Sequence, residues 1–273
     1  MEIMSAPLAR LRADARTEIF ERRFARLHVL SDGERDMLRR IGASPTQRYG
    51  PRTLITLTPA APKLFLLTGW VGRVRQLTGG RRQIISVAMP GDELNPHPSL
   101  AGRNELLKSL TPVQTVVADR IYALAATAAG AGIAAGLQAA ASLYDAFLLD
   151  QIVRLGRQTA FERIAHFLLE LRYRSDLAGL AIEGSSFPMP LTQENIADTL
   201  GLSVVHVNRT LQVMRRTGLI RLKSGQLTLL SPEKLAEICE FYHPLIPSPI
   251  EVQRNGSRPA TAFRTLVATQ LGG

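Results

Sequence analysis

The start of the chain carries two helical patterns. Apolar side chains recur at mostly helical steps between residues 8 and 28, which predicts an amphipathic helix. These positions are Leu8, Leu11, Ala15, Ile19, Phe24 and Leu27. Ser31 is followed three residues later by Glu34, the spacing of a capping box, so a second helix is expected to begin there. It should end near Gly42, because glycine commonly closes a helix.

Between residues 43 and 125 the pattern changes to short runs rich in leucine and β-branched residues, separated by glycine and proline. Polar and apolar positions alternate within the runs, and turn signals recur at close intervals. This pattern predicts an antiparallel β-roll or barrel. The clearest hairpin turn is Thr78-Gly79-Gly80-Arg81, and the strand pattern extends into residues 121–125.

A long helix is expected from about Ile133, because apolar residues then step by three and four. The stripe consists of Ile133, Leu137, Ala141, Tyr144, Leu148, Ile152 and Leu155. Such a seam, with small residues beside it, suits pairing with a second copy of the same helix. A core helix within its own chain is the alternative. A further helix is expected to start at residues 157–160.

Residues 121–144 raise a second alternative, a membrane span, because they carry no formal charge over a sufficient length. Alanine and glycine dominate this stretch in place of leucine and isoleucine, so insertion would be only weakly driven. We therefore expect no membrane partner.

Residues 191–220 contain the cap and turn residues that are typical of two short helices joined by a tight turn. Thr192 and Ser203 are each good N-caps, because a hydroxyl can accept a bond from a backbone N–H of the first helical turn. Gly201 suits the turn between the helices. Apolar side chains at helical spacing form the inner side: Ile196, Ala197, Leu200, Leu202, Val207, Leu211 and Met214. The pattern predicts a helix-turn-helix.

The second of these helices presents a basic face. Its outward positions are Val204, Val205, His206, Asn208, Arg209, Gln212, Arg215 and Arg216. This face contains three arginines and no carboxylate. Beyond Ile220, two short alternating runs flank Ser224-Gly225 and predict a β-hairpin, and Ser231-Pro232 then begins another helix.

This segment resembles the helix-turn-helix of the Crp/Fnr family of bacterial transcription regulators, over roughly the last third of the ordered chain. The matching residues are Thr192, Gly201, Ser203, Val207, Arg209 and the triplet Gly218 to Ile220. The N-terminal part resembles the cyclic-nucleotide-binding-type sensor domain of the same family, at Gly69, the hairpin turn and Pro90-Gly91-Asp92. The alternative is that small and apolar residues recur in this way in any small helical hairpin.

The resemblance implies an α+β fold. An N-terminal antiparallel β-roll, similar to cyclic-nucleotide-binding domains, would occupy residues 1–130, and a long central dimerisation helix residues 131–157. A C-terminal winged helix-turn-helix would occupy residues 158–243. Residues 244–273 are rich in proline, serine, arginine and glycine, and we expect a disordered tail. Family members dimerise through the central helix and contact RNA polymerase, so the resemblance implies both partners.

The sequence departs from the family in the expected effector pocket. Members that bind a cyclic nucleotide have a Gly-Glu pair for the ribose hydroxyl and an Arg-Ser or Arg-Thr pair for the phosphate. This chain has no Gly-Glu pair after Asp92, and only Arg103 or Lys108-Ser109 could replace the basic pair. Lysine lacks the bidentate fork of arginine. We predict that the β-roll binds a different effector or works without one, with Asp92, Arg103, Lys108 and Ser109 as candidate pocket residues.

Composition narrows the function classes. The 273 residues carry a formal net charge of +10 and a pI near 10.6, which attracts polyanions such as nucleic acid or an anionic membrane. The single cysteine, Cys239, excludes within one chain a disulfide framework, a thiolate zinc site and a four-cysteine iron–sulfur cluster. No secretory signal opens the chain, and these features are consistent with a reducing cytoplasm.

Two single residues have alternative interpretations. Cys239 lies in an apolar helical pattern, which favours a small buried side chain over a redox switch. His97 lies between two prolines, and the other histidines show no metal spacing, which favours a solvated loop residue over a haem or metal ligand. The sequence therefore predicts no cofactor, neither an iron–sulfur cluster nor haem.

These observations predict a homodimer that reads double-stranded DNA. Arg209 is the expected base contact, because guanidinium can bond guanine O6 and N7 together, and Asn208 is a weaker candidate, for a contact with adenine or phosphate. Val205 stands where the best-known members have a glutamate, and it can touch only a thymine methyl group. Thr192, Gln193, Ser203 and His206 are expected to position the helix on phosphates, and Val204 and Arg215 share its outward face.

Three rival functions are less favoured. An enzyme would need a nucleophile–base pattern, a glycine-rich phosphate loop or a metal cluster, and we find none of these in the sequence. A membrane-associated sensor depends on residues 121–144. A protein-binding module that does not act on DNA requires the arginine face to be incidental.

Overall fold

The structure is a computed structural model. It describes residues 17–56, 63–94, 105–117, 119–181 and 185–244. Several of the predictions above lie outside the described residues: the first part of the N-terminal helix, His97, Arg103 and the tail from residue 245 onward.

The two predicted N-terminal helices are confirmed as α2 (Ile19–Leu27) and α3 (Asp32–Gly42). The capping box is formed at α3, where the Ser31 hydroxyl accepts from the Glu34 amide at 3.3 Å. The Glu34 carboxylate accepts in turn from the Ser31 amide at 2.8 Å and from the Ile133 amide at 3.0 Å. Glu34 therefore caps its own helix and ties it to the start of the central helix.

The β-roll is confirmed as two four-stranded antiparallel sheets. The first sheet has the order β1 (Gln47–Tyr49), β8 (Val113–Val117), β3 (Leu64–Thr68), β6 (Glu93–Leu94). The second has the order β2 (Leu54–Ile55), β7 (Glu105–Ser109), β4 (Val71–Gln76), β5 (Arg82–Ala88). A 3-10 turn at Thr78–Gly80 joins β4 to β5, and Gly79 and Gly80 adopt positive φ angles of 76° and 77°, as the predicted hairpin requires.

The strand prediction is wrong for residues 121–125, which lie in the helix α4 (Asp119–Ala125). An alternating strand would bury every second side chain on one face, but Ile121 alone of this helix is fully buried. Alanine is a strong helix former, and it dominates the stretch that follows. Helix propensity therefore prevailed over a short apolar run that periodicity could not resolve.

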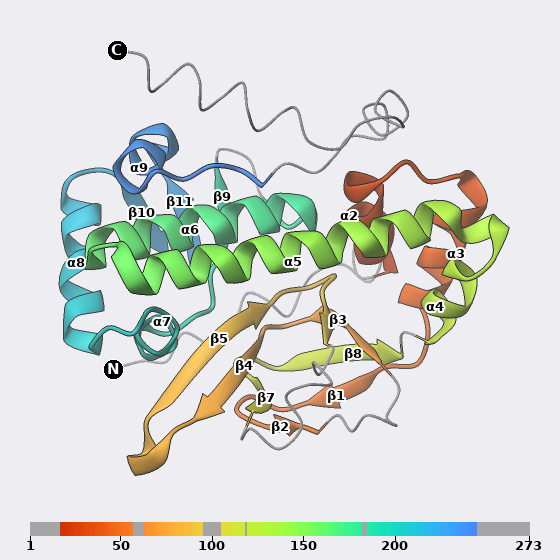
Figure 1. The fold of residues 1–273 in the computed structure, drawn as a ribbon, viewed down its shortest axis with the longest axis horizontal. Helices are drawn as coiled ribbons and strands as arrows, with labels where there is room; N and C mark the ends of the chain where they lie inside the picture. Colours follow the sequence, from red (N-terminus) through yellow and green to blue (C-terminus); the bar gives the residue numbers. More distant parts are fainter. Residues whose placement is uncertain (1–16, 57–62, 95–104, 118, 182–184, 245–273) are drawn as a thin grey trace.

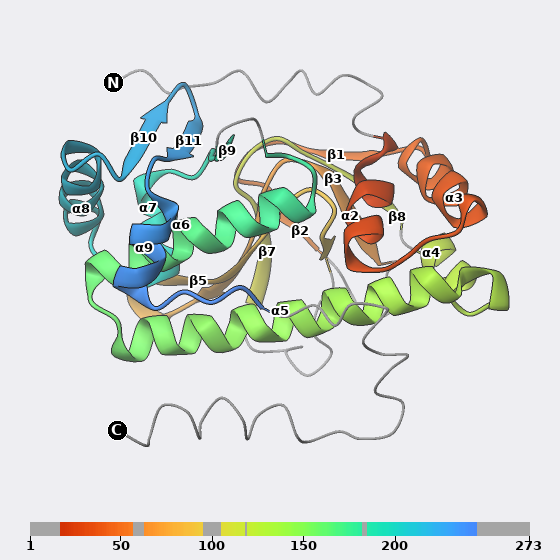
Figure 2. The same cartoon turned by 90° about the horizontal axis from the view of Figure 1, so that it is seen from above.

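The predicted central helix is confirmed as α5 (Ala131–Arg157), which runs along the whole molecule in both views (Figures 1 and 2). The predicted seam is wrong at its start, because Ile133 is fully buried against α2 and α4 within the chain. The large apolar side chains that α5 exposes lie in its second half: Leu149 at 63%, Ile152 at 67% and Val153 at 52%. Helical spacing identified apolar stripes, but it could not tell which stripe faces the roll.

Among the described residues, one helical stretch, Ala128–Arg157, has the length and composition to cross a bilayer. This observation is weak, because core helices of soluble proteins pass the same test. In this chain the stretch packs against α2, α4 and α6.

The C-terminal part follows the predicted order, with one addition. Its helices are α6 (Ala160–Leu177), α7 (Gln193–Leu200), α8 (Val204–Arg216) and α9 (Pro232–Cys239). Its sheet has the order β10 (Ile220–Lys223), β11 (Gln226–Leu229), β9 (Ser186–Pro188). The wing hairpin is confirmed, whereas β9 was missed because a three-residue strand that ends in proline has no readable period.

One buried cluster spans both halves of the molecule. Trp70, Ile84 and Met89 of the β-roll belong to the same apolar cluster as Leu171 of α6 and Leu200 of α7. The β4–β5 hairpin therefore packs directly on the C-terminal part. The two halves share part of their core.

Candidate nucleic-acid interface

The helix-turn-helix is built by local hydrogen bonds. Thr192 caps α7 by accepting from the Asn195 amide at 3.1 Å, and Ser203 caps α8 by accepting from the His206 amide at 3.2 Å. Between the helices Gly201 adopts a left-handed φ of 63°, a conformation that costs glycine little. Val207 and Met214 are fully buried beneath α8. These bonds and contacts fix which face of α8 points outward.

The outward face of α8 has the predicted composition. Val204, Val205, His206, Arg209, Gln212, Arg215 and Arg216 are all exposed. We call Arg209, Arg215 and Arg216 the α8 basic face. None of the three has an ion pair in the described part of the chain. Their charge is available to an external anion.

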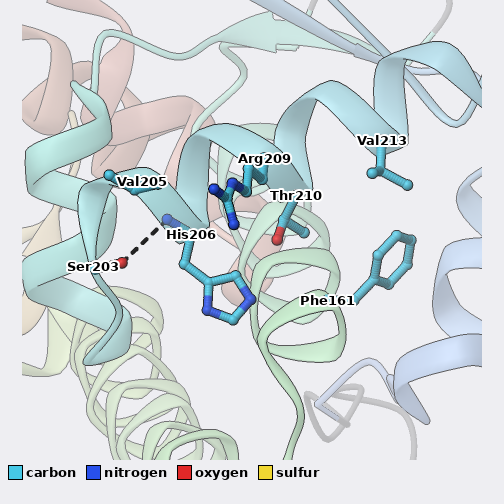
Figure 3. A pocket seen from close by; sticks show the side chains of 7 residues that line it. All are labelled: Phe161, Ser203, Val205, His206, Arg209, Thr210 and Val213. Atoms are coloured by element: carbon cyan, nitrogen blue, oxygen red, sulfur yellow. Dashed lines mark hydrogen bonds between the residues drawn. The ribbon is translucent and has the colours of Figure 1, made fainter.

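An open hollow of about 340 Å³ lies between α8 and the start of α6. Figure 3 shows Val205, His206 and Arg209 projecting from α8, with Phe161 of α6 opposite Val213. Apolar side chains, two hydroxyl groups, an imidazole and one guanidinium thus line the same hollow. This mixture suits the edges of stacked bases and the phosphates beside them.

Asn208, the weaker candidate for a contact with adenine or phosphate, is hydrogen-bonded within the protein. It is half-buried, and its amide nitrogen donates to the Gln193 side-chain oxygen at 3.0 Å. Its amide oxygen accepts from Gln212 at 2.8 Å. Both functional groups of Asn208 are therefore engaged within the protein, and the bond to Gln193 joins α7 to α8.

The β4–β5 hairpin makes polar contacts with α7 that the sequence did not reveal. Arg82 pairs with Glu194 at 2.7 Å and also with Asp198. The Asp198 hydrogen bond raises the pKa of Arg82 above its usual value, although partial burial opposes this shift. Gln83 donates to the Thr199 carbonyl oxygen at 2.9 Å. Arg82 and Asp198, like Gln83 and Thr199, are 116 positions apart in the sequence, so helical or strand periodicity could not predict these contacts.

Comparison with known proteins agrees with this geometry. Residues 162–238 match the model of the Crp-like helix-turn-helix domain. The chain is 32% identical over 178 residues to the nitrogen fixation regulation protein FixK of Bradyrhizobium diazoefficiens, covering 62% of this chain and 70% of FixK. The chain belongs to the Crp/Fnr family.

Two further similarities support this membership of the Crp/Fnr family. The FixK protein of Rhizobium meliloti is 28% identical over 217 residues, which cover 71% of this chain and 91% of that protein. The solved structure of FixK2 from Bradyrhizobium japonicum superposes with a TM-score of 0.58 at 25% identity, covering 71% of this chain and 96% of FixK2. This chain is a DNA-binding transcriptional regulator of the Crp/Fnr type.

The Crp/Fnr sensor half contains a cavity of about 410 Å³ between the β-roll and α5. Of the predicted pocket residues, Asp92 lines this cavity, whereas Lys108 and Ser109 are absent from its lining. The Ser109 hydroxyl donates to the Gly50 carbonyl oxygen at 2.6 Å and accepts from the Thr53 amide at 2.7 Å. The grouping of Lys108-Ser109 with Asp92 in one pocket is therefore wrong, because Ser109 is buried in a backbone turn.

Asp92 is already paired within the protein. Its two carboxylate oxygens lie 2.5 Å from Arg23 of α2 and 2.8 Å from Arg174 of α6. Burial alone would raise the pKa of Asp92, but the two guanidinium groups more than offset it and hold this pKa below its usual value. The turn after β5 therefore holds two helices together by charge.

The ion pairs continue from Arg174 into α5. Arg174 also donates to Glu170 at 3.0 Å, and Glu170 accepts from Arg154 of α5 at 2.5 Å. We call Arg23, Asp92, Arg154, Glu170 and Arg174 the junction network. It contains three cations and two anions, and the Arg154 and Arg174 guanidinium carbons also lie 5.6 and 5.3 Å from the ring centroids of Phe167 and Phe147. The network therefore joins α2 and the turn after β5 to the central helix α5 and to α6, the first helix of the C-terminal part.

Proposed function

We propose that this regulator binds a roughly palindromic DNA site as a homodimer. Its two copies of α8 would enter successive major grooves, with centres about 34–36 Å apart. The α8 basic face carries this proposal, because three exposed arginines lie on a helix whose orientation is fixed by its caps. A helix of this kind fits the major groove, and guanidinium groups match phosphates and guanine edges.

Within each half-site, Arg209 would read guanine and Val205, which is 61% exposed, would contact a thymine methyl group. Thr192, Gln193, Ser203 and His206 would position the helix on phosphates, and Val204 and Arg215 would contribute to the same surface. Because Asn208 is bonded to Gln193, we assign Asn208 the role of holding α7 against α8 in place of direct base reading.

The homodimer would form through the second half of α5. Leu149, Ile152 and Val153 expose apolar surface along that part of the helix, and burial against a second copy would remove this surface from water. This part of α5 also connects directly to α6. A change in how the two copies of α5 pack would therefore change the distance between the two copies of α8.

The β-roll would shift the equilibrium between two dimer arrangements through the junction network. We propose an effector other than a cyclic nucleotide, or none, because Asp92 is occupied by two arginines and Ser109 by backbone groups. The regulator would work without an iron–sulfur cluster or haem, in the cytoplasm, and would contact RNA polymerase as its relatives' family implies.

Selection of bound fragments from a random duplex pool tests the proposal. We expect a two-fold symmetric site with half-sites one helical turn apart, and a dimer by sedimentation at micromolar concentration. Failure to enrich any sequence, or a monomer that binds a palindrome, would contradict the proposal. Calorimetry with cyclic AMP and cyclic GMP tests the effector, and binding at low micromolar concentration would refute that part alone.

A further inference from the structure

The β4–β5 hairpin is strongly basic and lies beside the reading head. Residues 71–88 include Arg73, Arg75, Arg81 and Arg82 and no carboxylate. In Figure 1 the hairpin reaches the end of the molecule that carries α7 and α8, whereas α3 lies at the opposite end. The positive charges of these arginines are balanced either by carboxylates within the fold or by an external anion.

Arg82 is explained within the fold. Its guanidinium is shared by Glu194 and Asp198, the two carboxylates of α7. In a helix-turn-helix the first helix crosses the DNA backbone, so uncompensated carboxylates there would repel phosphates. Arg82 offsets that repulsion and at the same time holds the hairpin against α7.

Arg75 and Arg81 have no such explanation. Neither has an ion pair in the described part of the chain, and Arg81 is exposed. Arg75 stands directly opposite Gln83 in the β4–β5 register, so the two side chains share one face of the hairpin. Val74 and Ile84, on the other face, belong to the apolar cluster that includes Leu200 of α7, so Arg75 lies on the face that points away from this cluster. Gln83 reaches the Thr199 carbonyl oxygen because β5 is the edge strand beside α7. Arg81 directly precedes Arg82, which binds the same helix.

We propose that the β4–β5 hairpin is a second DNA-contacting element, in which Arg75 and Arg81 bind phosphates that flank the half-site read by α8. The proposal rests on the proposed function, since α8 must first place the duplex along α7. Charge complementarity selects DNA as the partner: the hairpin has four arginines and no carboxylate, its tip is exposed, and it lies beside α7, the helix expected to cross the DNA backbone. Phosphate contacts of this kind add affinity without adding base specificity.

The test compares the selected site in two duplexes, one trimmed to the two half-sites and one extended by about 10 bp on each side. Fluorescence anisotropy over a range of salt concentrations gives the affinity and its salt dependence. The variants are Arg75→Gln/Arg81→Gln and, as a matched control, Arg40→Gln. Arg40 is an exposed arginine of α3 at the far end of the molecule. Thermal unfolding verifies that all variants are folded, and Arg81→Gln alone serves if the double variant is not.

On the extended duplex, we expect the double variant to bind at least about tenfold more weakly than the wild type at low salt. The slope of log K against log salt should decrease by about 0.9 for each lost phosphate contact, so by up to about 3.6 for a dimer. The trimmed duplex should bind both proteins equally, and Arg40→Gln should match the wild type on both duplexes.

Equal losses on the two duplexes would overturn the proposal, because they would indicate a general electrostatic effect. Unchanged affinity of the double variant on the extended duplex would also overturn the proposal. If transcription by RNA polymerase were no longer activated in that case, the hairpin would be assigned to a protein partner. Suppose that the wild-type protein selects a site, that Arg209→Ala weakens binding to this site, and that the hairpin variants bind it like the wild type. Only the hairpin proposal then fails. If wild-type protein selects no site, the proposed function itself fails.

Discussion

Arginine has opposite tasks in two regions of this molecule. In the junction network, three arginines are buried and share two carboxylates and two aromatic rings. On the α8 basic face, three arginines are exposed on a helix that contains no carboxylate. The same side chain is neutralised within the fold in one region and presented to solvent in the other.

The difference shows that net charge is a poor measure of a binding surface. The chain carries +10, but the junction arginines contribute to fold geometry, because a buried guanidinium must be paired to offset its lost hydration. Counterions are released from DNA by exposed cationic side chains that reach phosphates, such as the unpaired arginines of α8. Mutations in the junction network should therefore lower the free energy of unfolding, whereas mutations on the α8 basic face should weaken DNA binding.

The largest expected effect follows from Asp92→Asn, which leaves Arg23 and Arg174 buried beside a neutral amide. We expect the free energy of unfolding to fall by about 3–5 kcal/mol. Urea denaturation followed by circular dichroism measures this change. Asp176→Asn is the matched control, since Asp176 pairs with Arg172 at 2.9 Å on the exposed side of the same helix as Arg174 and should change stability by less than about 1 kcal/mol. Equal effects of the two variants would refute a special role for the junction.

Acid should remove the stabilisation that the Asp92 ion pairs give to the folded state. The pKa of folded Asp92 lies below that of an unfolded aspartate, about 3.9, so its stabilising effect is complete above that pH and is lost as pH falls through the folded pKa. The stability difference between wild type and Asp92→Asn should therefore shrink below about pH 4. Urea titrations at several pH values measure it, and a difference that stays constant into strong acid would contradict the ion-pair interpretation.

Arg209→Ala should leave the free energy of unfolding unchanged and weaken binding to the selected site by about 1–3 kcal/mol. Selectivity should relax at one base pair of each half-site, because a guanidinium reads one guanine. Anisotropy with single-substituted duplexes measures both quantities, and Arg40→Ala is the control at the opposite end of the molecule. A loss that is uniform across all duplexes would make Arg209 a phosphate contact.

A smaller effect is expected from Ser203→Ala, which removes the cap of α8. The His206 amide would lose its 3.2 Å bond, so the free energy of unfolding should fall by about 1 kcal/mol. Ser203→Asn keeps an N-cap acceptor and should recover most of this loss. If both variants have wild-type stability, the cap does not hold α8, and the rigidity of the basic face needs another source.

The helix-turn-helix could be predicted from sequence because its determinants are local. Each cap joins residues three positions apart, and Gly201 marks the turn between the helices. Cys239 was likewise predicted as a buried apolar side chain, and burial raises the pKa of its thiol to about 11. Cap hydrogen bonds and helical periodicity both depend on residues that are close in the sequence, so both could be predicted from it.

Predictions that depended on packing between distant segments were less successful. Asp92 lines the cavity, as the resemblance to a family turn predicted, but its pairing with Arg174, 82 positions away, could not be predicted. Ile133 looked like a seam residue because periodicity does not say which of two helix faces meets the roll. In the same way, the contact of Arg82 with α7 has no sequence signature.

The sequence by itself determined the caps, the turn and the outward face of α8, the β-roll texture and the length of the central helix. Only the tertiary structure decided which arginines are neutralised, which half of α5 stays exposed and where the β4–β5 hairpin lies. The physical reason is range: hydrogen bonds within a helical turn are set by neighbouring residues, whereas the pairing of buried charges depends on which surfaces meet when the whole chain packs.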